Sequence, residues 1–445
     1  MFPYKIKYKS EGIIFCKFKI SIIFFALIGL LSGCASFGEG VVAGFLASSK
    51  KEDTRACKIW SKGFEGIDVS LNKTKGKTKV LMVHGVGRHL PGYSTVLYEN
   101  LAKELDLSVI DMPPKELTLF NQFNPSQKLG TLRLTRLLSK DRDKELLFYE
   151  LTWSSITDDE KENLNFDVSG QVAFRRAKVN RDMKLFSNDA IADPLLYLGE
   201  NREAILISVG QSLCWMTTHS WSDFPSDTHK PCTLKSINPE FLMNLEGDDY
   251  IFISHSLGSR ITMDGLQRLS RLLNAAGHSP TERELTLKSF PEFEKFRHAF
   301  QNRPIKIFML SNQLPLLQLG RPAPDVLNQH KDYCLPEGNR YAERFANETH
   351  IIAFSDPNDL LSYNIPFDFK KKFLDSRMCA RISNISINIA YVTDILGITD
   401  VANPLEAHVG YDHDERVIAL MAHGLGKDAM APIISKRCEW IELAR

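Results

Sequence analysis

Four apolar segments, each stopped by a turn of small or polar residues, constrain the fold of this chain more than any other feature. The segments are 79–83, 249–253, 305–310 and 350–354, and they are rich in Ile, Val, Leu and Phe. Continuous apolar runs of this length are typical of strands that are buried on both faces of a parallel sheet. Apolar residues at helical spacing follow the first two segments. The sequence therefore predicts an α/β protein with a doubly wound, mostly parallel sheet.

Composition excludes several other classes of protein. The chain has 445 residues, of which 43% are hydrophobic and 24% are charged, as in ordinary globular proteins, so it is neither disordered nor fibrous. Its formal net charge of +1 gives no basic face for binding nucleic acid through phosphate contacts. The sequence contains no Walker, dinucleotide-binding or zinc-protease motif, so we expect no cofactor and no metal.

The N-terminal segment predicts export. Two lysines precede a twelve-residue apolar run, 20–31, which covers about 18 Å as a helix and is too short for the ~30 Å core of a bilayer. A signal peptide over residues 1–33 fits better than a spanning helix. The run ends in Leu-Ser-Gly-Cys34, which resembles the bacterial lipobox. The resemblance implies a mature lipoprotein whose Cys34 thiol carries the lipid that anchors it to a membrane.

Two further expectations concern the anchor. An uncleaved anchor with an incidental cysteine is the alternative, and the body of the protein is exported in either case. Ala35 stands where some bacteria place the acidic residue that retains lipoproteins at the inner membrane, which favours the outer membrane. Residues 34–78 are rich in Gly, Ser and Lys and predict a tether, followed by the folded body over 79–445.

The remaining cysteines fit an exported protein. Besides Cys16 in the signal segment and Cys34 there are six, an even number that permits disulfides. We expect at least one bridge, and Cys214 and Cys232 are the nearest pair along the chain. The six are Cys57, Cys214, Cys232, Cys334, Cys379 and Cys438.

A pentapeptide at the end of the second apolar segment has the form of a nucleophile turn. In Ser254-His255-Ser256-Leu257-Gly258, Ser256 stands at the apex between a predicted strand and a predicted helix. A sharp turn there presents a serine hydroxyl at the end of the strand, and the Leu257 amide at the helix start points toward a developing oxyanion. The alternative is a strand that ends in a capping serine, with His255 in the core.

The turn after the first apolar segment strengthens the catalytic interpretation. His84-Gly85-Val86-Gly87 resembles the oxyanion turn of the α/β-hydrolase family. The resemblance implies an α/β-hydrolase fold and an oxyanion hole made by the Val86 and Leu257 backbone amides. We expect His84 to have a structural role in this turn.

The same resemblance implies an acid and a base later in the chain, because the family orders its triad as Ser, then Asp or Glu, then His. Asp356 and Asp359 both follow the apolar segment 350–354. Asp359 is preferred because Asp359-Leu-Leu-Ser-Tyr resembles the turn that carries the acid in many lipases. Asp356 is the alternative, and the residue not used is expected to stabilise the turn.

Three histidines compete for the role of base. His408 lies in a loop that an aromatic residue and a predicted closing helix follow, as in lipases, and is preferred. His413 stands in a charged run and is expected to face solvent, whereas His423 lies within helical periodicity. The preferred triad is therefore Ser256, His408 and Asp359.

The stretch between the first two strands, about 113–248, predicts an insertion that serves in part as a cap or lid, including a hairpin of 131–138 and 145–153. Within it, Asp193-Pro-Leu-Leu-Tyr-Leu-Gly199 resembles the run before the nucleophile in intracellular phospholipase A1 proteins. A basic cluster in the same stretch could attract anionic head groups, although such clusters are more often solvated helix faces. Its members are Arg175, Arg176, Lys178, Arg181 and Lys184.

Together these features predict a membrane-tethered serine hydrolase of acyl esters, with a lipid or phospholipid as substrate. A thioesterase or an acyltransferase would use the same triad, because the triad does not set the leaving group. A non-catalytic envelope scaffold or binding lipoprotein with a hydrolase fold is the alternative from a different class.

Overall fold

The computed structural model describes nine stretches of the chain, and the expected signal peptide and Cys34 lie outside them. The described residues are 55–109, 112–169, 172, 175–225, 230–232, 245–273, 293–395, 399–427 and 430–443. No helix among them is long and apolar enough to cross a bilayer. By its internal contacts, residues 162–188 form a small unit, separate from the large unit of 54–161 and 189–445.

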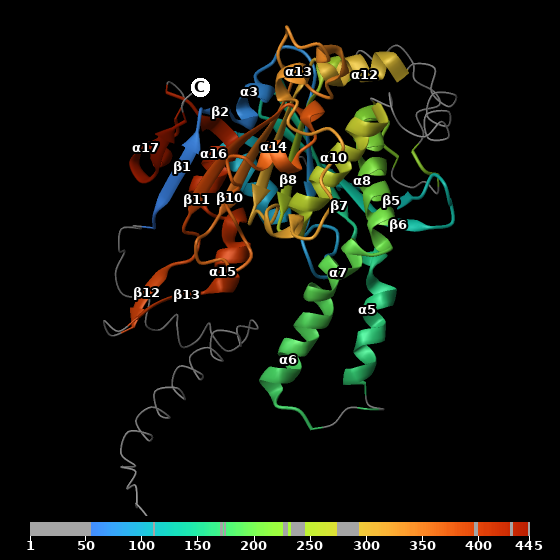
Figure 1. Ribbon diagram of the computed structural model, residues 1–445, viewed down its shortest axis with the longest axis vertical. Helices are drawn as coiled ribbons and strands as arrows, with labels where there is room; N and C mark the ends of the chain where they lie inside the picture. Colours follow the sequence, from blue (N-terminus) through green and yellow to red (C-terminus); the bar gives the residue numbers. More distant parts are fainter. Residues whose placement is uncertain are drawn as a thin grey trace, which may run out of the picture. The chain divides into compact units, whose positions relative to one another are not determined.

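A central parallel sheet forms the large unit, as the apolar segments predict (Figure 1). Six neighbouring strands run parallel, and the four predicted segments provide four of them. In spatial order the six are β7 (Glu145–Thr152), β3 (Thr78–Val83), β8 (Asp249–His255), β9 (Pro304–Leu310), β10 (Glu348–Ser355) and β11 (Ala380–Ile387). The chain is thus an α/β protein with a mostly parallel sheet.

Antiparallel strands extend the sheet on both sides. Beyond β7 lies β6 (Lys128–Ser139), which pairs with both β5 (Lys115–Phe120) and β4 (Leu107–Val109). Beyond β11 lies β1 (Cys57–Ser61), which runs antiparallel to β11 and parallel to β15 (Glu439–Glu442). The first and last strands of the described chain are therefore neighbours.

Two expectations about boundaries are corrected by these strands. The predicted hairpin forms, with Thr131 opposite Thr152, but as β6 and β7 it belongs to the central sheet and not to a cap. Most of β7 is buried because it lies between β3 and β6. Residues 57–71, expected in the tether, form β1, β2 (Phe64–Glu65) and α3 (Ile67–Leu71), and Ile59 and Ile67 lie in the core. The folded body therefore begins before residue 79.

Helices cover both faces of the sheet, and the alternation of side chains along β3 explains the two cores. Leu81 and Val83 pack on the face that α8 (Asn201–Thr218) and α10 (Leu257–Leu273) cover. Val80 and Met82 pack on the face covered by α3, α4 (Thr95–Glu104) and α16 (Glu415–His423). This three-layer arrangement buries β3 on both faces, which is why its sequence is continuously apolar.

Shorter elements complete the described chain. They are β2 (Phe64–Glu65), α5 (Asp158–Asn165), α6 (Lys178–Phe186), α7 (Ala192–Leu198), α12 (Phe293–Gln301), α13 (His330–Cys334), α14 (Phe369–Phe373), β12 (Val392–Ile395), β13 (Thr399–Ala402), α15 (Pro404–Val409), β14 (Gly424–Leu425) and α17 (Pro432–Arg437).

All six remaining cysteines form disulfides, which confirms the expectation of at least one bridge. Cys214 is bonded to Cys232, the pair nearest along the chain. The other two bonds join distant segments, Cys57 with Cys438 and Cys334 with Cys379.

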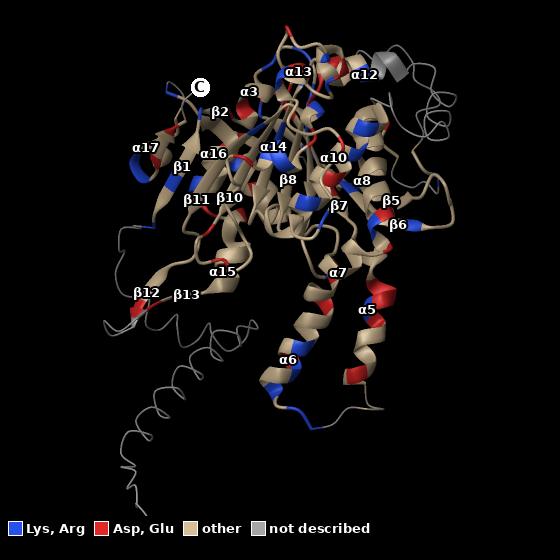
Figure 2. Ribbon diagram, in the orientation of Figure 1, with Lys and Arg blue, Asp and Glu red and all other residues tan. Residues whose placement is uncertain are grey.

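The small unit contains the whole predicted basic cluster. Asp167 pairs with Arg176 at 3.1 Å and also with Lys184. The helix α6 carries Lys and Arg along its length, as the blue segments in Figure 2 show. None of its residues is buried. The expectation of a solvated helix face therefore holds for α6.

Candidate active site

The order of strands singles out one edge of the sheet. From β3 the chain passes to β7 on one side, and later returns to β8 on the other side of β3. Ligands of open α/β sheets bind at the carboxyl ends of strands where the order reverses in this way. The turn of residues 84–87 follows β3 and Ser256 follows β8, so both candidate motifs lie at this switch point.

Ser256 has the strained backbone of a nucleophile turn. Its φ is +54°, in the left-handed region that residues other than glycine rarely adopt. Two glycines allow the close packing around it. A Cβ on Gly85 would lie 2.6 Å from the Ser256 Cβ, and one on Gly258 would lie 2.3 Å from the Val83 carbonyl oxygen. The turn after β3 therefore touches Ser256 directly.

Three polar side chains from three different loops form a relay at this edge. His408, in α15, places its Nε2 3.1 Å from the Ser256 Oγ. Its Nδ1 lies 3.0 Å from each carboxylate oxygen of Asp359. Asp359 follows β10, two strands away from β8 in the sheet. The structure thus brings together the three residues that the sequence selected.

Burial and hydrogen bonding tune the acid of this relay. Burial raises the pKa of the Asp359 carboxyl, but the hydrogen bonds from His408 and Ser311 outweigh it and hold that pKa below its ordinary value. Asp359 also accepts the Leu361 amide at 2.9 Å. Asp359 is therefore ionised at neutral pH and is held in place from three sides.

Ser311 belongs to the site, although the sequence analysis missed it. It follows β9, the strand between β8 and β10, and its φ is +48°. Its hydroxyl donates to Asp359 at 2.6 Å and lies 2.9 Å from the His408 Nδ1. The only signal in the sequence is its position directly after an apolar strand, because no motif surrounds it. Ser311 orients the acid and the imidazole at the same time.

His255 holds the backbone of the histidine loop. Its Nε2 donates to the His408 carbonyl oxygen at 2.8 Å, and the two imidazole rings meet edge to face. Burial, and then the neighbouring His408, lower the pKa of His255 to about 3, so the ring is neutral at physiological pH. His255 is partly buried at the end of β8, so it is not the core histidine of the alternative interpretation, and its contact positions the candidate base.

His84 has the structural role that the sequence predicts. The Trp153 amide donates to the His84 Nε2 at 3.1 Å, so the proton is on Nδ1, which donates to the Gly85 carbonyl at 2.8 Å. The indole of Trp153 stacks on the ring and donates to the His84 carbonyl. Burial lowers the pKa of His84 well below its ordinary value. The neutral ring therefore fixes the turn that carries the Val86 amide.

The amides after Val86 are occupied by carboxylates. The Gly87 amide donates to the buried Asp193 at 2.7 Å, and the Arg88 amide donates to Asp189 at 3.1 Å. Lys161 contacts Asp193 at 2.7 Å, and burial nevertheless raises the pKa of that carboxyl. Asp193 begins the segment that resembles phospholipases A1, and the structure assigns it to holding the turn. The Leu257 amide lies in the first turn of α10, where amides have no intrahelical acceptor.

The alternative residues have other functions. Asp356 accepts the Asn358 amide at 2.7 Å, so it stabilises the turn, as expected of the acid not used. It also accepts the amides of Ile389 and Ala390 at 2.7 and 3.0 Å. His413 is exposed and pairs only with its neighbour Asp412 among the described residues. His423 bonds to two acidic side chains from α3 and α4. None of the three contacts Ser256.

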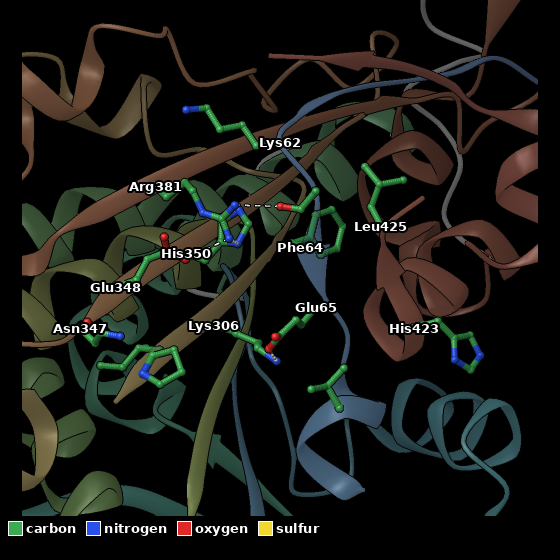
Figure 3. A pocket seen from close by; sticks show the side chains of 15 residues that line it. Lys62, Phe64, Glu65, Lys306, Asn347, Glu348, His350, Arg381, His423 and Leu425 are labelled. Atoms are coloured by element: carbon green, nitrogen blue, oxygen red, sulfur yellow. Dashed lines mark hydrogen bonds and ion pairs between the residues drawn. The ribbon is translucent and has the colours of Figure 1, made fainter. Parts of the chain in front are cut away.

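The opposite edge of the sheet contains an open cavity. It has a volume of about 610 Å³ and lies at the amino ends of β9, β10 and β11 (Figure 3). Two of its basic side chains are paired with glutamates, Lys306 with Glu65 at 3.3 Å and Arg381 with Glu348 at 2.9 Å. The buried His350 accepts from Arg381 at 2.9 Å. Because Nδ1 accepts, the proton of the neutral ring is on Nε2, which donates to the Ser383 hydroxyl at 2.8 Å. His350 is therefore not oriented as a base toward that serine, unlike His408 at the carboxyl edge.

Comparison with protein-family models, with characterised proteins and with solved structures finds no match to this chain. The chemistry of the site therefore rests on its geometry.

Proposed function

We propose that this protein is a serine hydrolase that cleaves acyl esters through an acyl-enzyme, with a lipid or phospholipid as substrate. One observation carries the proposal: the His408 imidazole lies 3.1 Å from the Ser256 hydroxyl and 3.0 Å from the Asp359 carboxylate. This relay lies beside a turn that is fixed by buried hydrogen bonds. Such a relay activates a hydroxyl that is otherwise a weak nucleophile.

In the first half of the reaction, the Ser256 Oγ attacks the ester carbonyl carbon and transfers its proton to the His408 Nε2. The imidazolium is stabilised by the ionised Asp359, which also fixes the tautomer that leaves Nε2 free to accept. The Val86 and Leu257 amides donate to the oxyanion. When the bond to the alcohol breaks, His408 returns its proton to the leaving oxygen.

In the second half, water attacks the acyl carbon and gives a proton to His408. The second tetrahedral intermediate collapses, the acid is released, and the proton returns to Ser256. Ser256 itself is buried, so substrate reaches its hydroxyl only after neighbouring segments move apart. A closed nucleophile of this kind limits access by water until substrate binds.

The fold supports the assignment to the α/β-hydrolase family. The nucleophile follows one parallel strand, the acid follows a later strand, and the histidine follows in the chain, in the order Ser, Asp, His. A second amide comes from the loop between an earlier strand and its helix, the arrangement that this family uses for its oxyanion hole. The lipid substrate is supported by the resemblances at residues 31–34 and 193–199.

A fluorophosphonate probe tests the enzyme against the alternative of a non-catalytic scaffold. We expect the wild-type protein to be labelled, in buffer or with lipid vesicles, and the Ser256→Ala variant to be unlabelled. Asp356→Asn serves as a control because it alters the same edge outside the relay. Absence of labelling in a folded wild-type protein under both conditions would contradict the proposal and favour the scaffold.

Mass spectrometry of lipid extracts tests the substrate class. After incubation with wild-type protein and with Ser256→Ala, we expect released fatty acid and a lysophospholipid or alcohol only with the wild type. Hydrolysis of soluble p-nitrophenyl esters without any change in the lipid extract would leave an esterase and remove the lipid substrate.

A further inference from the structure

We propose that the carboxyl edge of the sheet docks on a lipid bilayer surface, with the candidate active site facing the membrane from which the chain is tethered. The contact is an apolar rim of six exposed side chains, defined as Leu90, Leu195, Leu198, Leu360, Leu405 and Val409. This inference rests on the proposed function and extends it, because it states how a lipid ester reaches Ser256.

Each member of the apolar rim lies beside a component of the site. Leu360 is next to Asp359 in the chain. Leu405 and Val409 are exposed on α15, the helix that positions His408, and their spacing of four residues puts them on one face. The rim therefore flanks the acid and the base.

The oxyanion side contributes the other half of the apolar rim. Leu90 follows the turn of residues 84–87. Leu195 and Leu198 are three residues apart on α7, the helix whose Asp193 accepts the Gly87 amide. Leu90, Leu195 and Leu360 are 74%, 68% and 71% exposed. Single exposed leucines are common, but several around one site mark an interaction surface.

The chemistry of the apolar rim favours lipid over protein. Its members are all aliphatic, and two exposed tyrosines at the same edge, Tyr363 and Tyr391, have the amphipathic rings that are enriched where proteins meet the membrane–water interface. Lipid tails are as apolar as leucine side chains, so a bilayer can receive such residues without a shaped partner surface. The occupant that fits the rim is therefore a lipid surface.

The path of the chain supports the same orientation. In the sheet register Cys57 pairs with Ile387, so β1 begins at the carboxyl end of β11, on the edge of the relay. Arg55, where the described chain begins, lies over the ring of Tyr391 at 4.4 Å. Only 20 residues separate Cys34 from Arg55. Even fully extended they span about 70 Å, so a lipid on Cys34 would keep the body within that reach of the bilayer, and the chain enters the body at this edge.

Fluorescence quenching tests the docking without turnover. In full-length protein carrying Ser256→Ala, we add either Leu360→Trp or, as the matched control, Val69→Trp. Val69 is an exposed apolar residue that lines the cavity at the opposite edge. The chain already has five tryptophans, so each signal is taken as the difference from the Ser256→Ala protein without the added tryptophan. With vesicles of brominated phosphatidylcholine and phosphatidylglycerol, we expect quenching of the tryptophan at position 360 and none of the one at position 69. Equal quenching at both positions, or at position 69 alone, would overturn the docking.

Hydrolysis in vesicles provides the second test. We compare two double variants. The rim variant carries Leu360→Asp and Leu405→Asp, and the control carries Val69→Asp and Leu335→Asp, whose sites lie at the opposite edge. For the rim variant, the ratio of vesicle hydrolysis to p-nitrophenyl ester hydrolysis should fall at least tenfold, and for the control it should stay constant. An unchanged ratio in the rim variant would contradict the inference.

The two tests also separate failure of docking from failure of the proposed function. A wild-type protein that hydrolyses no ester removes the function, but quenching at position 360 would still establish docking. Hydrolysis of vesicle lipid that is insensitive to the rim substitutions, with no quenching at position 360, would remove docking and keep the enzyme.

Discussion

The two edges of the central sheet both hold histidine, serine and charged side chains, but they differ in what those side chains contact. At the amino edge, Lys306 and Arg381 each pair with a glutamate around an open cavity. At the carboxyl edge, contacts run in one direction, from carboxylate to imidazole to the hydroxyl of the buried Ser256. The proposed hydrolase thus rests on the carboxylate that orients His408 toward the serine, whereas His350 at the amino edge contacts a guanidinium. An accessible cavity alone does not indicate such chemistry.

Removal of the nucleophile should give the largest difference between the two edges. We expect Ser256→Ala to lower the turnover number for p-nitrophenyl esters by about 10⁶-fold, the loss typical of a serine triad. Glu65→Gln, at the amino edge, should leave the rate unchanged. The measurement is the initial rate of ester hydrolysis by both purified variants. A comparable loss in Glu65→Gln would mean that the cavity, and not the relay, is the site of reaction.

Within the carboxyl edge, substitution of Asp359 should affect the rate, whereas substitution of Asp356 should affect mainly stability. Asp359→Asn removes the charge that stabilises the imidazolium and should lower turnover by about 10⁴-fold with little change in melting temperature. Asp356→Asn weakens the buried acceptor of two backbone amides and should lower the melting temperature by several degrees, with a much smaller effect on the rate. Ester-hydrolysis kinetics and thermal unfolding of both variants distinguish the two roles. The reverse pattern would assign the acid to Asp356.

A smaller effect is expected from Ser311, whose hydroxyl donates to Asp359 and contacts His408. Ser311→Ala removes a hydrogen bond to a charged carboxylate, a loss of about 1.5–3 kcal/mol that corresponds to roughly 10- to 100-fold in rate if it acts in the transition state. Ser311→Thr should retain part of the rate because it keeps the hydroxyl. An alanine variant as active as the wild type would make Ser311 a packing residue only.

The smallest effect concerns stability and should be shared by both edges. Burial lowers the pKa of His255 to about 3 and that of His350 well below its ordinary value. Below a pH of about 6.5 the unfolded chain binds protons that these rings do not bind in the folded state, so the free energy of unfolding falls as the pH falls. His255→Gln and His350→Gln should each reduce this slope by up to about 1.4 kcal/mol per pH unit between pH 6 and 4.

Denaturant unfolding at several pH values measures the slope for both variants, and ester hydrolysis at neutral pH provides the contrast. Only His255→Gln should lower the rate, because only His255 contacts the histidine loop. An unchanged slope in both variants would show that neither ring is kept neutral by the fold.

The sequence predicted the relay residues better than it predicted where the folded body begins and which strands join the central sheet. Ser256, Asp359 and His408 each follow a strongly apolar strand or precede a clear helix, and in a parallel sheet the carboxyl ends of strands meet at one edge. That geometric rule needs no knowledge of strand order. Ser311 was missed because a single serine after a strand gives no motif, and its role depends on β9 lying between β8 and β10.

The start of the folded body and the membership of the sheet were harder to predict because they depend on pairing between distant segments. Strand β1 has only five residues, and it is placed in the sheet by β11 and β15, more than 300 residues later in the chain. The hairpin of β6 and β7 was predicted as a hairpin from local pattern. Its place beside β3 could not be predicted, since a local pattern does not say which strand it joins.

The bond between Cys57 and Cys438 has a mechanical consequence. Any pull on the chain ahead of Arg55 reaches Cys57 within two residues, and there it is divided between β1 and the segment just after α17. The force is thus carried by the disulfide and by the neighbouring strands β1 and β15, which would have to shear from the sheet together. A protein fastened at its amino end could in this way bear tension from a moving membrane without unravelling from that end.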